Sequence, residues 1–255
     1  MTSAASGEHP AGIAELVAAM RRRLDGLPAG EAALGEFLAT YLRTTEAVGA
    51  AVAARDFEDP DWVERWDVAF ADLYLAALDA HLDPAGTPSR PWRLAFDAAT
   101  SRPPLLNVLL GINAHINYDL PQALLAVISD AEFADPKLLE SRHRDHIRID
   151  AVLAGRVAAE DVELSARSVR SLVDRGLRPA NRWASRRFLA EARVKVWRNT
   201  TELQRARAAG ADPFRARLAE LEVLTAAKVA DLLRPGQVLL RLAVSGFGVT
   251  LPPPA

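Results

Sequence analysis

The chain has 255 residues, with 31 basic and 33 acidic side chains and no cysteine. This length suits one large globular domain, and the missing cysteines exclude disulfides, thiolate metal sites and a cysteine nucleophile. The net charge of −2 gives no electrostatic reason to expect a nucleic-acid partner. No apolar run approaches the roughly 20 residues that span a bilayer. The N-terminal residues lack the pattern of a secretory signal, so we expect no membrane partner and a cytoplasmic location.

The first half of the chain carries apolar residues at helical spacing. Proline and glycine at residues 83–88 break this pattern. Asp59 or Asp61 is expected to cap the helix that follows the acidic loop before it. The predicted helices cover residues 13–24, 31–54 and about 61–82, and a short segment with Trp92 and Phe96.

The second half continues the helical pattern with one interruption near the middle of the chain. Pro121 interrupts it, because the residue before a proline avoids the helical conformation. Gly176–Pro179 is typical of a turn, and residues 238–244 fit either a strand or a short helix. The predicted helices cover residues 105–117, 121–128, 135–156, about 180–209 and 212–233.

The near absence of strand patterns predicts an all-α fold. We expect a single compact domain of about eight to ten helices over residues 11–245, with bundle-like or orthogonal packing. Residues 1–10 are expected to form a disordered tail, and residues 246–255 an extended or disordered C-terminal tail.

The helix near the middle of the chain combines apolar residues with several polar ones. His115 and Asp119 lie four residues apart and therefore share a helix face, and Asn113, Asn117 and Tyr118 lie close by. A His and an Asp in this spacing can bind a metal, or the carboxylate can fix the imidazole tautomer. In the alternative, structural interpretation, Asp119 caps the next helix and His115 is a hydrogen-bonded core residue.

The segment from Asn113 to Leu124 reads Asn-Ala-His-Ile-Asn-Tyr-Asp-Leu-Pro-Gln-Ala-Leu. It resembles the core motif of an uncharacterised family common in actinobacteria, domain of unknown function 5995. Asp150 stands where the family pattern has Asn. The resemblance covers residues 35–205 and implies membership of a family whose activity is not established. Its further segments are Phe57–Trp62, Phe70–Tyr74, Pro91–Phe96, Asp145–Asp150, and Ala192–Arg193 with Trp197 and Leu203.

A second group of candidate ligands lies on the helix that follows. His143, His146 and Asp150 share one face by their spacing, next to Asp145. If that face meets His115, two helices supply nitrogens and carboxylates sufficient for zinc, manganese or iron. Alternating Arg and Asp also fit a solvated helix face. The predicted metal ligands are His115, Asp119, His146 and Asp150.

These patterns lead to two functional hypotheses. The first is an enzyme that acts on a small molecule, either as a metal-dependent hydrolase or as an acid/base cyclase or isomerase. The second is a non-catalytic helical module that binds a ligand or a protein, in which the His-Asn-Asp motif holds helices together. The predicted catalytic residues are His115, Asp119, Asp145 and Arg193. The predicted substrate-binding residues are Asn113, Tyr118, Asp72, Tyr74 and Trp197.

Overall fold

The structure is a computed structural model of the chain that describes residues 12–167, 172–236, 242 and 246–253, with side chains outside 153–189. Every regular element in these ranges is helical, so the all-α prediction is confirmed. Within the same ranges, no helix combines the length and the apolar character needed to cross a membrane.

The first three long helices pack against one another. They are α1 (Ile13–Asp25), α2 (Gly35–Ala53) and α3 (Pro60–Leu82), with the short 3-10 helix η1 (Ala29–Leu34) between the first two. Asp59 caps α3 by accepting the Trp62 N–H at 3.0 Å, with Pro60 in the first turn. Of the two predicted caps, Asp59 is therefore the correct one.

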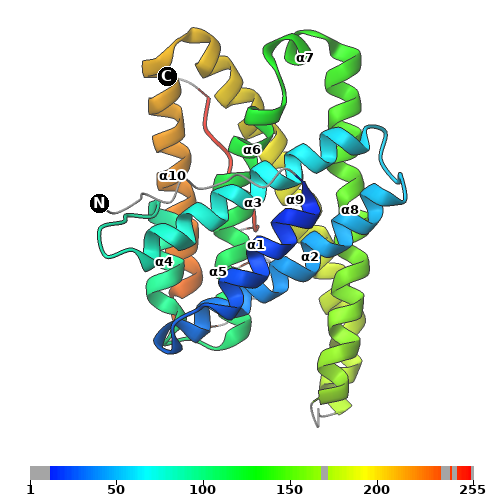
Figure 1. Ribbon diagram of the computed structural model, residues 1–255, viewed down its shortest axis with the longest axis vertical. Coiled ribbons are helices and arrows are strands. Elements are labelled where there is room, and N and C mark those ends of the chain that lie inside the picture. The colour runs from blue at the N-terminus through cyan, green and yellow to red at the C-terminus, as the bar shows by residue number, and fades with distance from the viewer. Residues whose placement is uncertain (1–11, 168–171, 237–241, 243–245, 254–255) are drawn as a thin grey trace.

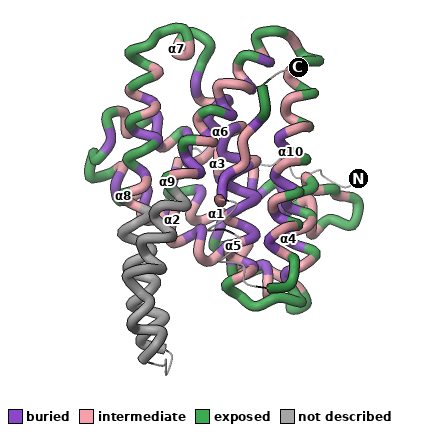
Figure 2. The backbone as a smooth tube through the Cα atoms, turned by 180° about the vertical axis from the view of Figure 1, so that it is seen from behind, coloured by how far each residue is buried: buried purple, intermediate pink, exposed green. Residues whose placement is uncertain are grey.

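The remaining helices pack around these three and against one another. The pair α8 and α9 extends well beyond the rest of the molecule (Figure 1), and α10 packs on α4 and α9. Buried residues concentrate in the middle, around α3, α5 and α6 (Figure 2). The helices are α4 (Arg90–Ala99), α5 (Pro104–Ala114), the π-helical turn η2 (His115–Asp119), α6 (Leu120–Val127), α7 (Asp130–Ala134), α8 (Pro136–Arg167), α9 (Leu172–Ala209) and α10 (Ala211–Leu233).

The turn predicted at Gly176–Pro179 is wrong, because α9 begins at Leu172 and continues through these residues. The predicted tail 1–10 and the predicted element at 238–244 lie outside the described residues, apart from Leu242.

The C-terminal segment (residues 246–253), where the sequence analysis expected an extended or disordered tail, has no regular secondary structure and is packed into the fold. Phe247 and Leu251 are buried. In Figure 1 the segment runs into the molecule between α10 and α6.

Candidate functional site

The helix that carries the central motif contains one π-helical turn, η2. Its closing bond joins the Leu120 N–H to the carbonyl of His115, five residues earlier. Pro121 explains the wider turn, because its ring would clash with the carbonyl four residues back in a regular helix. The interruption predicted at Pro121 is therefore a widened turn on its N-terminal side. π-Helical turns are frequent at functional sites.

His115 and Asp119 form a buried polar pair inside this turn. The His115 Nδ1 lies 2.9 Å from the Asp119 Oδ2. The indole N–H of Trp92, on α4, donates to the same oxygen at 2.8 Å. The Asp119 side chain makes no cap hydrogen bond to α6, so the capping interpretation of Asp119 is wrong.

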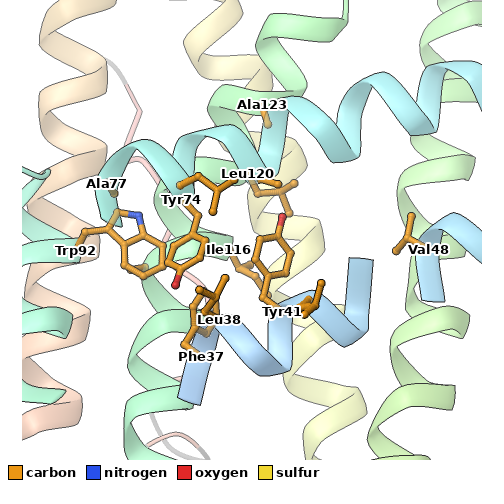
Figure 3. Close-up of a cluster of buried hydrophobic side chains, with 14 of the residues drawn as sticks. Phe37, Leu38, Tyr41, Val48, Tyr74, Ala77, Trp92, Ile116, Leu120 and Ala123 are labelled. Carbon is orange, nitrogen blue, oxygen red and sulfur yellow. The ribbon is translucent and has the colours of Figure 1, made fainter. Parts of the chain in front are cut away.

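Five aromatic side chains surround the imidazole ring of His115. Phe70 stacks on it with a centroid distance of 3.5 Å and an interplanar angle of 4°. Tyr41 meets it edge-on at 4.6 Å. Tyr74 and Trp92 lie next to one another (Figure 3), with ring centroids 5.0 Å apart, and each centroid lies 5.9 Å from that of His115. We call these residues the aromatic cluster: Phe37, Tyr41, Phe70, Tyr74 and Trp92.

Burial controls the charge of the pair. Desolvation lowers the pKa of His115, and the bond to Asp119 only partly counteracts this. Desolvation also raises the pKa of Asp119, although the hydrogen bonds to His115 and Trp92 lower it. A neutral His115 that donates through Nδ1 keeps a lone pair on Nε2. That Nε2 is buried and has no hydrogen-bond partner among the described residues.

The hydroxyl oxygens of Tyr41 and Tyr74, whose rings contact His115, are buried without a partner among the described residues, and so is the Oδ2 of Asp67 on α3. Burial raises the pKa of Asp67 to about 7, and the charge of Glu64 adds to this. Burial raises the pKa of Tyr41, and the charge of Asp67 raises it further. The sequence analysis missed Asp67. Its signal was a carboxylate on the apolar face of α3, three residues before Phe70.

A small cavity of about 20 Å³ lies next to the aromatic cluster. Phe37, Trp92, Asn107 and Gly111 line it together with residues of η1 and α4. The Asn107 Nδ2 donates to the carbonyl of Ala99 at 2.8 Å, and its buried Oδ1 has no partner in the described part of the chain. A Cβ atom on Gly111 would lie 2.5 Å from the Phe37 ring, so glycine allows α5 to approach α2 this closely. The volume suits about one water molecule.

The predicted substrate-binding residues do not gather around His115, except Tyr74. Asn113 donates instead to the carbonyl of Phe247, in the C-terminal segment, at 3.1 Å. Tyr118 packs on a separate apolar cluster with Leu251. Asp72 is half-buried and lies near Arg23 on α1. The hydrogen bond to Asp79 raises the pKa of Arg23 against the effect of burial, and the charge of Asp72 makes a smaller contribution in the same direction as Asp79.

The second group of candidates forms a separate network between α8 and α9. Arg193 is ion-paired with Asp150 and donates to the carbonyl of His146 at 3.2 Å. The His146 ring lies 5.5 Å from the rings of Trp66 and Trp197. Burial, together with the charge of Arg193, lowers the pKa of His146 well below its ordinary value.

Asp145 holds the start of α3 against α8. Its Oδ1 accepts the Glu58 N–H at 2.8 Å, and its Oδ2 accepts the Asp59 N–H at 2.9 Å. Arg148 donates to Oδ1 as well, at 3.3 Å. Both carboxylate oxygens of this predicted catalytic residue are therefore engaged in structural hydrogen bonds.

The four predicted metal ligands lie in two different networks, one around Asp119 and one around Arg193. Among the residues that the structure describes, no group of three or more His, Asp or Glu side chains is placed to hold a metal ion. Metal binding by this chain stays a prediction that the arrangement of His115, Asp119, His146 and Asp150 does not support.

Comparison with known proteins gives one match. The model of a family of unknown function, DUF5995, matches residues 13–235. This range includes every candidate residue named above except those of the C-terminal segment. No curated protein and no solved structure matches the chain.

Proposed function

The chain belongs to the DUF5995 family of unknown function, and from the surroundings of His115 we propose that it is an enzyme that uses this residue as a general base on a small, largely apolar molecule. One observation carries the proposal. The buried Nε2 of His115 has no partner among the described residues, while Asp119 fixes the other nitrogen of the same ring.

The neighbouring residues have distinct roles in this proposal. His115 accepts a proton from the substrate at Nε2, which is free because burial keeps the imidazole neutral at pH 7. Asp119 is a positioning residue that stabilises the imidazolium once it forms, and Trp92 orients Asp119. The hydroxyl groups of Tyr41 and Tyr74 are available to donate to a substrate oxygen. This arrangement suits an isomerisation or cyclisation that begins with removal of a proton.

The aromatic cluster limits the substrate to a small molecule with a planar or apolar body. His115 is only 3% exposed, so the substrate reaches it through movement of neighbouring side chains. The small cavity beside Phe37 and Trp92, lined on its other side by Ala33 and Leu34 of η1, is the approach that we propose for the substrate. Exclusion of water from such a site strengthens the electrostatic effect of Asp119 on the imidazolium.

A carbon acid of suitable shape tests the base directly. 5-Nitrobenzisoxazole is planar and apolar, and its ring opens to a coloured phenolate once a base removes its proton. We expect the native chain to accelerate this reaction and His115→Asn to lose the acceleration, since Asn retains a donor toward Asp119 but has no basic nitrogen. His143→Asn is the matched control, because His143 packs against Trp197 outside the aromatic cluster. An equal rate for His115→Asn and the native chain would contradict the proposal.

The two bonds to Asp119 also support a second, purely structural function of the buried pair. Because Trp92 and His115 bond to the same oxygen, the pair also links α4 to η2, as a purely structural polar contact would. Diethyl pyrocarbonate separates the two functions, since it acylates neutral imidazole nitrogens that solvent can reach. Peptide mapping of the folded chain should show a modified His115 if the site opens. Modification of His115 only after unfolding would favour the structural function.

A further inference from the structure

The helices α2 and α3 pack against each other in opposite directions. Phe37 of α2 meets Tyr74 of α3 with ring centroids 4.9 Å apart. One turn later on α2, Tyr41 meets Phe70, one turn earlier on α3, with ring centroids 6.0 Å apart. The buried side chains that precede Phe70 on the same face of α3 therefore lie toward the part of α2 that follows Phe37.

The carboxyl group of Asp67 lies on this face of α3, three residues before Phe70. Tyr41 projects from α2 with its hydroxyl on the side of α3 (Figure 3). Burial raises the pKa of Tyr41, and of the neighbouring charges that of Asp67 adds most, ahead of that of Asp119. Both carboxyl groups are buried and electrostatic interactions weaken with distance, so Asp67 is the one nearer to the Tyr41 hydroxyl.

These two side chains both have hydrogen-bonding capacity that the chain itself does not use. The Oη of Tyr41 and the Oδ2 of Asp67 are buried, and neither has a partner among the described residues. Burial without a neighbouring cation favours the neutral carboxyl form of Asp67, whose pKa is about 7. A neutral carboxyl group donates a hydrogen bond through its O–H, as a tyrosine hydroxyl does. We call Tyr41 and Asp67 the donor pair.

The donor pair adjoins the base that we propose. The ring of Tyr41 lies 4.6 Å from that of His115. Phe70, on the same face of α3 as Asp67, stacks on the same imidazole at 3.5 Å. A base beside two hydrogen-bond donors is suited to the enolisation of a ketone, because removal of a proton next to the carbonyl group places negative charge on its oxygen.

We propose that the donor pair binds the carbonyl oxygen of a small apolar ketone, which names the substrate class and rests on the proposed role of His115. The Nε2 of His115 removes a proton from the carbon next to the carbonyl group. The electron pair of that C–H bond forms a C=C bond, and the π electrons of the C=O bond move to the oxygen, where Tyr41 and Asp67 donate to it. The imidazolium then returns the proton to the same carbon or, in an unsaturated ketone, to the conjugated one, which gives the ketone or its isomer.

The colour of 4-nitrophenol tests the donor pair on the full chain. Its anion is planar and carries negative charge on an oxygen, as an enolate does. Two hydrogen-bond donors favour the anion over the neutral phenol. At pH 6, where Asp67 is largely protonated, the native chain should therefore raise the yellow absorption of the anion. A titration with protein gives the dissociation constant.

Four variants assign this binding to the donor pair. Tyr41→Phe and Asp67→Leu each remove one donor and should weaken binding of the anion about tenfold or more. Asp67→Asn should retain most of the binding, because its amide still donates. Thr225→Val is the control, since it removes another buried hydroxyl without a partner among the described residues, on α10, and should bind like the native chain. If Asp67→Leu does not fold by circular dichroism, Tyr41→Phe decides.

Acetophenone tests the substrate class. It is a small, planar, largely apolar ketone, and its methyl protons exchange for deuterium in D₂O when a base forms the enolate. We expect the native chain to accelerate this exchange, and Tyr41→Phe to lower the accelerated rate about a hundredfold, as loss of one donor to an oxyanion does. Proton NMR spectra follow the exchange. Equal exchange in Tyr41→Phe and the native chain would contradict the proposal.

Failure of the donor pair and failure of the base give different results. His115→Asn should still bind the 4-nitrophenol anion, because that binding needs no base. A native chain that binds the anion but does not open 5-nitrobenzisoxazole would support the donor pair and reject His115 as the base. A native chain that leaves the colour of 4-nitrophenol unchanged, or an Asp67→Leu variant that binds the anion as tightly as the native chain, overturns the proposal.

Discussion

Trp92 donates its indole N–H to Asp119 at 2.8 Å, across the space between α4 and η2. This bond fixes the carboxylate that in turn orients His115. Trp92 and Asp119, 27 positions apart in the sequence, thus act together on one nitrogen of the imidazole, Nδ1.

The variant Trp92→Phe measures the strength of this contact. It keeps an aromatic ring but leaves Asp119 with one donor fewer, so we expect the free energy of unfolding to fall by about 1–3 kcal/mol more than in a control. Trp66→Phe is that control, because Trp66 is equally buried and its N–H has no partner among the described residues. Urea unfolding of both variants provides the comparison, and equal losses would contradict the importance of the bond.

NMR spectroscopy tests the state of His115. We expect a neutral ring that is protonated at Nδ1, with a pKa below 6.5, because burial disfavours the imidazolium. In Asp119→Asn the pKa should fall further, since the carboxylate that stabilises the charged ring is gone. Long-range proton–nitrogen correlation spectra over a pH series give both quantities. A proton on Nε2 of the native ring at neutral pH is incompatible with this description.

Asp67 should make stability depend on pH. Its pKa is about 7 in the folded chain against 3.8 for an ordinary aspartate, so the folded state binds the extra proton between these values. Stability from this group is therefore fully present below pH 4 and falls by about 1.4 kcal/mol per pH unit as the pH rises toward 7. Asp67→Asn should remove this slope and be more stable than the native chain at pH 8. Denaturation midpoints at pH 4, 6 and 8 check the sign.

The two asparagines of the central motif should differ in their effect on stability. Asn117→Ala removes both a donor and an acceptor and leaves the Val249 N–H without its partner, which costs about 1–3 kcal/mol. Asn113→Ala removes one of two donors to the Phe247 carbonyl and should cost less. Unfolding free energies and amide exchange at Val249 measure the difference. The reverse order would mean that the segment is held in another way.

The variant Asp145→Asn should weaken the attachment of the start of α3 to α8. An amide offers only one oxygen, so either Glu58 or Asp59 loses the acceptor of its N–H. We expect a loss of about 1–3 kcal/mol in stability and faster amide exchange at these two residues. Glu140→Gln, an exposed change on the same helix, should alter stability by less than about 0.5 kcal/mol. Unchanged exchange at Glu58 and Asp59 would argue against this role.

The sequence by itself determined the features that depend on near neighbours. Helical periodicity predicted most of the helices, because each one buries a face set by residues three and four apart. The spacing of His115 and Asp119 predicted their pairing, and Asp59 was one of two expected caps for α3. In each case the interacting groups lie within one helical turn of each other.

Only the tertiary structure decided where the other polar side chains find their partners. Asn117 bonds to Val249, 132 residues away, and Asp145 bonds to Glu58, 87 residues away. No local pattern contains such a pairing, since it depends on how the helices pack. The same packing of α2, α3 and α4 surrounds His115 with aromatic rings and leaves its Nε2 without a partner among the described residues.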